Sequence, residues 1–272
     1  VIVIDDKSDD RTGEIVQNII NLNSSKDIKL ISGSELPEGW MGKCWACHNL
    51  SLDAKGDYLL FVDADVILDK RAVASAVSEM DEKSLDMLTV FPKQIMRTIG
   101  EKAIVGTFMD WLLLTLLPLR QVYETKYSSL SAVCGQFLMF RRDSYDAIGG
   151  HVAVAGEVVE DREFGYAMKT SGHSIAVYLP NDLVFCRMYD GFQESVNGFT
   201  KNFYKGAKMP LPLFSAWILL MFFTLFVPFL LVFFDTRFMI IIAINLIGRA
   251  VQALSIKQDP LEAILMHPIQ MI

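Results

Sequence analysis

The sequence predicts an α/β domain built on a mostly parallel sheet and followed by helices that cross a membrane. Short β-branched runs alternate with amphipathic helices at the start, with a strand over residues 1–4, a helix over 13–22 and a strand over 28–31. That alternation is typical of βαβ units. The residues after Pro210 are almost all apolar, which predicts a separate membrane region.

Composition limits the classes of function. The chain has 272 residues and a formal net charge of −7, which argues against a nucleic-acid-binding surface. Its four cysteines are too few for a disulfide framework in a chain of this length, so we expect a reducing, cytosol-facing catalytic part. The abrupt start within a strand and the abrupt apolar end predict a fragment, cut inside a domain and inside a membrane segment.

The stretch over residues 58–65 organises the rest of the chain. Five apolar or aromatic residues over 58–62 predict a central parallel strand buried on both faces. Asp63 and Asp65 follow it directly, at the end of the strand where α/β proteins bind ligands. Two such close carboxylates suit a divalent cation, Mg²⁺ or Mn²⁺, held together with substrate phosphates. The alternative is a solvated acid pair at a strand end.

An acidic turn follows the first strand and contains Asp5, Asp6, Ser8 and Asp10. It would repel phosphate, but its oxygens can accept hydrogen bonds from ribose hydroxyls or a base N–H. Capping of the next helix by Ser8 or Asp10 explains only part of this acidity.

A loop over residues 37–42 leads into a predicted helix over 43–54. Gly42 and Lys43 at its start form a candidate diphosphate site, because backbone amides, the helix dipole and an ammonium converge there. Cys44, Cys47 and His48 match the c-type haem pattern, but we expect the thiols to pack inside the domain.

The middle of the chain continues the alternation. We expect a helix over 70–80, strands over 87–91 and 132–140, a short helix over 141–148, and two late strands over 175–179 and 183–187. Residues 103–119 predict a membrane-surface or buried helix rather than a span. A further helix opens near Gly156 and runs to about Ser171, with Gly172 as its C-cap. Its acids Glu160 and Asp161 either complement the helix dipole or supply a general base.

The C-terminal part, residues 209–272, predicts transmembrane helices over about 211–234 and 238–256 and the start of a third segment. Pro228 predicts a kink in the first, while Asn245 and Arg249 weaken the second. Lysines precede the first helix (Lys201, Lys205, Lys208) and follow the second (Lys257). By the positive-inside rule we expect a multi-pass protein of the plasma membrane, with residues 1–208 in the cytoplasm.

Taken together, the motifs resemble those of a family 2 glycosyltransferase of the GT-A fold, a Rossmann-like nucleotide-diphospho-sugar transferase. The carrying motifs are Asp5-Asp6-x-Ser8-x-Asp10-x-Thr12, Asp63-Ala64-Asp65 and Glu160-Asp161. The chain is similar in particular to the branch that glycosylates carotenoid acids, and to hopanoid-associated glycosyltransferases. That similarity rests on Leu36-Pro37-x-Gly39-Trp40-x-Gly42-Lys43-x-Trp45-Ala46, Gly135-Gln136-Phe137, Gly149-Gly150-His151 and Arg187-Met188-Tyr189.

The resemblance implies roles for these residues. Asp5 and Asp6 would contact uridine and ribose, helped by Ser8, Asp10, Gly42 and Lys43. Asp63 and Asp65 would hold the divalent cation (Mn²⁺ or Mg²⁺) on the diphosphate. Asp161, beside Glu160, would deprotonate the acceptor and invert the anomeric centre. Trp40, Gly135, Gln136 and Arg187 would lie on the acceptor side.

Two departures from the family pattern qualify these expectations. The family's first strand is missing here, and Lys201-Asn202 stands where processive synthases carry Gln-x-x-Arg-Trp. The sequence thus favours a single transfer from a nucleotide sugar, such as a UDP-sugar, to a lipid-like acceptor. A metal-dependent nucleotidyl- or phosphotransferase and a non-catalytic membrane scaffold stay open as alternatives.

Overall fold

The computed structural model describes residues 1–112, 132–207 and 209–270. Its core is a four-stranded sheet in the order β3 (Tyr58–Val62), β7 (Phe137–Arg141), β5 (Met87–Val90) and β8 (Ile175–Tyr178). β7 runs antiparallel to both β3 and β5, whereas β5 and β8 are parallel. The sheet is therefore mixed, and the domain is of the predicted α/β class.

The prediction that 58–62 forms a central parallel strand is wrong. Among the described residues, β3 lies at the end of the ladder and pairs only with the antiparallel β7. Only Leu59 in β3 is fully buried, whereas every residue of β5 is. A run of apolar letters does not distinguish an edge strand from a central one, because both can cover a core on one face.

Residues of the sheet alternate between two hydrophobic clusters. Leu138 and Phe140 point to the face covered by Phe164 and Met168, which come from α8 (Glu160–Thr170). Phe137 and Met139 point to the other face, which α3 (Ala72–Glu82) covers with Ala72, Ala76 and Met80. This alternation follows from the two-residue period of a strand.

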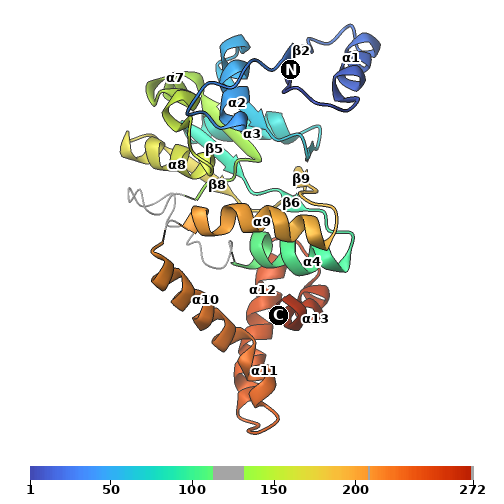
Figure 1. Cartoon of the computed structure of the whole chain (residues 1–272), viewed down its shortest axis with the longest axis vertical. Helices are drawn as coiled ribbons and strands as arrows, with labels where there is room; N and C mark the ends of the chain where they lie inside the picture. The colour runs from blue at the N-terminus through green and yellow to red at the C-terminus, as the bar shows by residue number, and fades with distance from the viewer. Residues whose placement is uncertain (113–131, 208, 271–272) are drawn as a thin grey trace.

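The N-terminal unit is a small βαβ arrangement, drawn in dark blue in Figure 1. β1 (Ile2–Asp5) and β2 (Lys29–Ser32) are parallel and α1 (Thr12–Leu22) connects them. The predicted alternation at residues 1–31 is confirmed. α2 (Gly42–Asp53) then leads toward β3.

Smaller elements complete the domain. β4 (Val66–Leu68), β9 (Val184–Cys186) and β6 (Lys93–Gln94) form a three-stranded sheet. α7 (Arg142–Ala147) and a 3-10 helix (Gly150–Val154) precede α8. α8 begins at Glu160 rather than near Gly156, and Gly172, with a φ of 80°, follows it as predicted.

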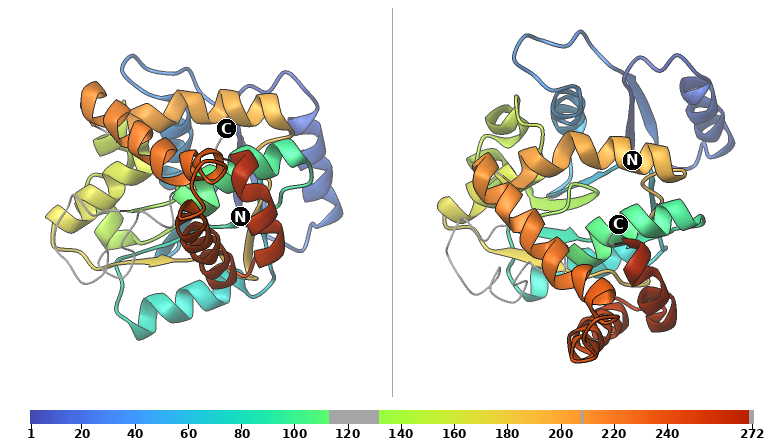
Figure 2. Two further views of the ribbon diagram at one scale, coloured as in Figure 1. Left: turned by 90° about the horizontal axis from the view of Figure 1, so that it is seen from below. Right: turned by 60° about the horizontal axis from the view of Figure 1, so that its bottom comes forward.

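Two helices lie side by side between the sheet and the C-terminal helices: α4 (Ile99–Val105) and α9 (Phe192–Ala207) (Figures 1 and 2). Thr98 caps α4, since its hydroxyl accepts from the Glu101 N–H at 3.2 Å, and the Glu101 carboxylate accepts from the Arg97 N–H at 2.7 Å. It continues as a π-helix (Gly106–Leu112). The rest of the predicted 103–119 helix lies outside the described residues.

The apolar C-terminal part folds into α10 (Leu211–Leu225), α11 (Val227–Leu231), α12 (Phe238–Ser255) and α13 (Pro260–Gln270). The helix pair over Leu211–Leu231 and the helix Phe238–Ser255 are long and apolar enough to cross a membrane, and 6% and 17% of them are buried. Such exposure is unlike that of a core helix in a soluble protein. The first predicted span breaks at Phe226, two residues before Pro228.

Candidate active site

The centre of the candidate site is the ammonium of Lys43, in the first turn of α2. It lies 2.9 Å from an oxygen of Asp63 and 2.9 Å from an oxygen of Glu160. Burial alone would lower the pKa of Lys43, but the charges of Glu160 and Asp63 outweigh it and raise that pKa. Lys43 therefore stays protonated and joins the acid after β3 to the acid that opens α8.

Asp161 lies next to this ion pair and accepts a 2.8 Å hydrogen bond from the backbone N–H of Gly135. Burial, with the neighbouring charge of Glu160, raises the pKa of Asp161 to about 6. Hydrogen bonds from the N–H groups of Gly135 and Arg162 act in the opposite direction. A carboxyl group with this pKa can give up and take a proton near neutral pH.

A side chain in place of Gly135 would be tightly confined. A Cβ atom there would lie 3.3 Å from the Asp161 carboxylate and 3.3 Å from the Lys43 ammonium. The glycine thus lets the backbone approach both charged groups. Its N–H contact with Asp161 was not anticipated from the sequence, where Gly135 was expected on the acceptor side only.

Asp63 and Asp65 stand in the turn between β3 and β4. The Asp63 N–H donates to the Gln136 carbonyl at 3.3 Å, and the Val66 N–H donates to the Asp63 carbonyl at 3.1 Å. Burial raises the pKa of Asp63 against the effect of Lys43, and the nearby charge of Asp65 adds to the rise. Asp65 itself is exposed, so one of the two acids faces solvent.

The acidic turn lies at the carboxyl end of β1. Asp5 accepts from the Ser8 N–H at 3.0 Å, and Asp10 accepts from the Thr12 N–H at 2.8 Å, at the start of α1. Asp10 therefore has the capping role that the alternative interpretation gave it. Asp6 lies between the end of β2 and the start of α2. A Cβ atom built on Gly42, the first residue of α2, would lie 3.8 Å from the Asp6 carboxylate. The turn and the Gly42-Lys43 corner thus adjoin.

The predicted acceptor-side residues do not all gather at Lys43. Trp40 packs on Trp45 and His48, with ring centroids 4.9 and 5.2 Å apart. The side chain of Gln136 is buried and donates to the Cys186 sulfur at 2.9 Å. Of this set, only Gly135 lies against the Lys43 ammonium, whereas the Gln136 backbone carbonyl accepts from the Asp63 N–H.

Arg187 has a different set of partners. Its guanidinium lies 3.1 Å from Glu101 and 2.7 Å from Asp190. Glu101 is 1% exposed, and hydrogen bonds from Arg97, Arg187 and Gly191 overcome its burial and lower its pKa to about 2. This network fastens α4 to the loop after β9.

The thiols pack as expected. Cys44 is buried, and its sulfur donates to the Val154 carbonyl at 3.4 Å. Burial raises the pKa of Cys44 to about 11 and that of Cys47 to about 12, so neither is a thiolate at neutral pH.

The ion pair between Lys43 and Glu160 is not predicted from the sequence. The sequence indicates only that Lys43 meets the diphosphate and that Glu160 lies beside Asp161. The signal that could have indicated it is chemical: Lys43 lies between acidic motifs in a chain with a formal net charge of −7.

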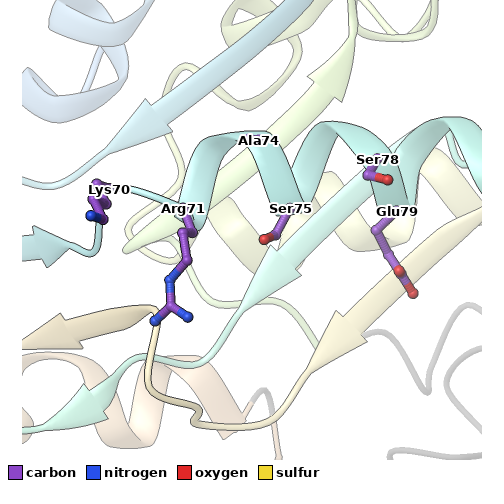
Figure 3. Close-up of a pocket in the computed structure, with 6 residues that line it drawn as sticks. All are labelled: Lys70, Arg71, Ala74, Ser75, Ser78 and Glu79. Carbon is purple, nitrogen blue, oxygen red and sulfur yellow. The ribbon is translucent and has the colours of Figure 1, made fainter.

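A surface hollow of about 680 Å³ lies elsewhere, over the outer side of α3. Figure 3 shows Arg71 and Glu79 projecting from that helix, with Ser75 and Ser78 between them. α3 covers the opposite face of the sheet from α8, which carries Glu160 and Asp161. This hollow is therefore not part of the site.

Comparison with known families decides the identity of the domain. Residues 1–149 match the family described as glycosyl transferase family 2, which is more than half of the chain. The chain belongs to glycosyl transferase family 2. The glycosyltransferase resemblance drawn from the motifs is confirmed.

The chain is similar to curated proteins named 4,4'-diaponeurosporenoate glycosyltransferase. The 4,4'-diaponeurosporenoate glycosyltransferase of Staphylococcus haemolyticus is 25% identical over 78% of this chain and 55% of its own length. That of Staphylococcus aureus is 28% identical over 76% of this chain and 54% of its own length. The chain spans about half the length of these relatives.

A solved structure supports the fold. A mannosyltransferase from Pyrobaculum calidifontis, in complex with GDP-Man and Mn²⁺, superposes with a TM-score of 0.51. It is 18% identical and covers 98% of this chain and 77% of its own. At this identity the likeness shows the GT-A-like fold alone.

The acids of the glycosyltransferase can be tested for fit to a cation. No group of three or more His, Cys, Asp or Glu side chains that could hold a metal occurs in the described parts of the chain. Mg²⁺ usually takes only one or two carboxylates together with phosphates and water. Asp63 and the exposed Asp65 are two carboxylates of this type, so the donor chemistry suits a cation that arrives with a diphosphate, although both Asp63 oxygens contact Lys43 here.

Proposed function

We propose that this family 2 glycosyltransferase is a membrane-anchored, inverting enzyme. It transfers a sugar from a nucleotide-diphospho-sugar, such as a UDP-sugar, to a lipid-like acceptor of the carotenoid-acid or hopanoid type. The names of the curated relatives support the acceptor class. The observation that carries the proposal is the position of Asp161, with its raised pKa, beside the Lys43 ion pair.

The donor binds across the carboxyl ends of β1 and β3 in this proposal. Asp5, Asp6, Ser8 and Asp10 offer oxygens to the base and ribose, and Gly42 and Lys43 meet the diphosphate. An ammonium has three N–H donors, and Asp63 and Glu160 are its two carboxylate partners here. Both Asp63 oxygens lie within 3.0 Å of the ammonium, so a diphosphate oxygen would replace one of these contacts.

Asp63 and Asp65 hold the divalent cation. When bound, a divalent cation neutralises the charge that builds on the leaving diphosphate. Asp63 is held in place by its N–H bond to Gln136 and by Lys43. The exposed Asp65 turns toward the incoming complex in this proposal.

Asp161 acts as the general base on the acceptor. An acceptor hydroxyl attacks the anomeric carbon on the face opposite the leaving diphosphate, and its proton passes to the Asp161 carboxylate. The Gly135 N–H holds the carboxylate in one orientation. Glu160 raises the pKa of Asp161, which makes it a stronger base.

Residues 1–208 form the catalytic domain and residues 209–272 the membrane region in this proposal. The helices over Leu211–Leu231 and Phe238–Ser255 cross the bilayer as a hairpin. The lysines on both flanks support a catalytic domain in the cytoplasm, at the plasma membrane.

Transfer to defined acceptors tests the function. Purified protein in nanodiscs is given UDP-sugars with a carotenoid acid or a hopanoid, with Mn²⁺, Mg²⁺ or a chelator, and products are identified by mass spectrometry. We expect a glycosylated lipid and free UDP. Release of a nucleoside monophosphate instead would indicate a nucleotidyl- or phosphotransferase and contradict the proposal.

A further inference from the structure

The Lys43 ammonium occupies the acid that the proposed function assigns to the divalent cation. It lies 2.9 Å from Oδ1 and 3.0 Å from Oδ2 of Asp63, so it contacts both carboxylate oxygens. An ammonium and a divalent cation on the same two oxygens would repel each other. Asp63 can therefore bind a divalent cation only after Lys43 has given up at least part of this contact.

The two carboxylates that hold Lys43 differ in exposure. The Glu160 side chain is 10% exposed and lies 2.9 Å from the ammonium, whereas the Asp63 side chain is 30% exposed. Among the described residues, Lys43 is the one cation paired with Glu160. Loss of that pair would leave a buried carboxylate without compensation, which is more costly than the loss of a pair at a more exposed acid. Lys43 should therefore leave Asp63 more readily than it leaves Glu160.

Lys43 has the freedom that such a movement needs. Its side chain is 44% exposed and consists of a flexible four-carbon stem, while its backbone is fixed as the second residue of α2. Glu160 is the fixed member of the pair, because it is buried at the start of α8. Gly135 bounds the ammonium on one side, since a Cβ atom there would lie 3.3 Å from it. The ion pair thus joins a flexible cation to a fixed acid.

We propose that Glu160 is a positioning residue for the donor. When Asp63 binds the divalent cation, Glu160 keeps the Lys43 ammonium in the site, and the N–H groups that Lys43 withdraws from Asp63 are donated to the diphosphate. The inference rests on the proposed function, since it assumes a nucleotide-diphosphate donor. Glu160 acts through Lys43 and does not itself contact the donor.

This role differs in sign from a simple effect of charge. A carboxylate close to a diphosphate repels it, so removal of the Glu160 charge would by itself strengthen diphosphate binding. Removal of a carboxylate that positions Lys43 should instead weaken diphosphate binding, because the ammonium can then turn into solvent. The weakening should be largest with the divalent cation present, since without it Lys43 keeps its contact with Asp63.

Nucleotide binding tests the proposal without a measurement of transfer. The full chain in detergent is titrated calorimetrically with UDP and, separately, with GDP, in Mn²⁺ and in a chelator, with no acceptor present. The variants are Glu160→Gln, Lys43→Met and the double variant, with circular dichroism to verify folding. The matched control is Glu163→Gln, which removes the same charge from the same first turn of α8.

We expect Glu160→Gln to weaken nucleotide binding about tenfold with Mn²⁺ and less than about threefold with the chelator. Glu163→Gln should not weaken it in either condition. In the Lys43→Met background, Glu160→Gln should cause no further weakening, because Glu160 then has no cation to position. This last comparison carries the test if Glu160→Gln alone fails to fold, since the double variant has no buried charge at position 160.

Unchanged or tighter nucleotide binding in folded Glu160→Gln would overturn the proposal. An equal loss with and without Mn²⁺ would also overturn it, because a general structural role would act in both conditions. A further loss in the double variant would mean that Glu160 acts without Lys43, which contradicts the proposal as well. If the wild type binds neither UDP nor GDP, the proposed function itself fails, and this inference fails with it.

Discussion

The ammonium of Lys43 lies 2.9 Å from the carboxylate of Glu160, which joins the start of α2 to the start of α8. The same ammonium lies 2.9 Å from Asp63. The Lys43 ammonium therefore links the predicted metal-binding acid, Asp63, to the helix that carries the predicted base, Asp161. Substitutions at Lys43 should affect both Asp63 and Asp161.

Lys43→Met should raise the pKa of Asp161 above its value of about 6, because the Lys43 charge lowers that pKa. The acid limb of kcat/KM should then move to higher pH. Two acids also lose their partner, and since Lys43 is 44% exposed, we expect a loss of about 1–3 kcal/mol in unfolding free energy. The pH profile and denaturant unfolding measure the two effects.

Lys55→Met is the matched control, since Lys55 lies exposed just beyond the same helix. It should change neither quantity. Lys43→Arg keeps the charge and should retain most of the stability. An unshifted acid limb in Lys43→Met would contradict the electrostatic link between Lys43 and Asp161.

Asp65→Asn should nearly abolish transfer while leaving the fold intact, because Asp65 is exposed in a turn and not part of the core. Asp57→Asn provides the control, since Asp57 is an exposed acid at the opposite end of the same strand. Transfer rates across a Mn²⁺ titration, with circular dichroism for folding, give the answer. Activity like that of the wild type at saturating donor would remove Asp65 from the cation site.

Local pattern was sufficient for most elements. The apolar spacing over residues 13–22 predicted α1 within one residue of its observed Thr12–Leu22. It could not predict that β3 pairs antiparallel with β7, because that pairing joins segments remote in sequence. The Lys43–Glu160 and Gly135–Asp161 contacts are long-range in the same way. The motifs indicated which residues matter, and only the fold showed which ones touch.

Asn245 has a structural role that the sequence pattern did not indicate. In the sequence it weakened the second span. In the structure its side-chain amide donates to the Thr224 carbonyl at 3.0 Å. That carbonyl stands four residues before Pro228, which has no N–H to offer it. The polar residue therefore satisfies a backbone group that the proline leaves free.

This pairing predicts a coupled effect. Asn245→Leu should destabilise the helix pair by about 0.6–1.7 kcal/mol, measured by unfolding in detergent. With Pro228→Ala in the background, the helix N–H can bond Thr224, and the same substitution should cost less. Additive effects in the double-mutant cycle would mean that the two residues act independently.

The topology can be tested by accessibility. A cysteine placed at Thr236, in the turn between α11 and α12, should react with a membrane-impermeant reagent from outside the cell. A tag before Val1 should not be reached. Labelling of both from the same side would mean that the two spans do not form a hairpin with the domain in the cytoplasm.

The base is the most direct test of the mechanism. Asp161→Asn should reduce turnover of a hydroxyl acceptor by about 10²–10⁴-fold, with donor affinity almost unchanged. In the wild type, kcat/KM should rise with pH through about 6, because Asp161 must be deprotonated and its pKa is raised from 3.8. This acid limb should be absent in the variant.

The raised pKa of Asp161 also has a cost in stability with a definite sign. Between pH 3.8 and about 6 the folded protein binds more protons at Asp161 than the unfolded chain, so its contribution to stability falls as pH rises. Asp161→Asn should remove that slope.

Glu163→Gln, in the same helical turn, is the control and should leave the acid limb in place. Glu160→Gln should be milder than Asp161→Asn. A carboxylate acceptor arrives already ionised, so the Asp161 effect should shrink with a carotenoid acid compared with a hydroxyl acceptor. Loss of donor binding in Asp161→Asn with no acceptor present would place Asp161 on the nucleotide side and refute its assignment as the base.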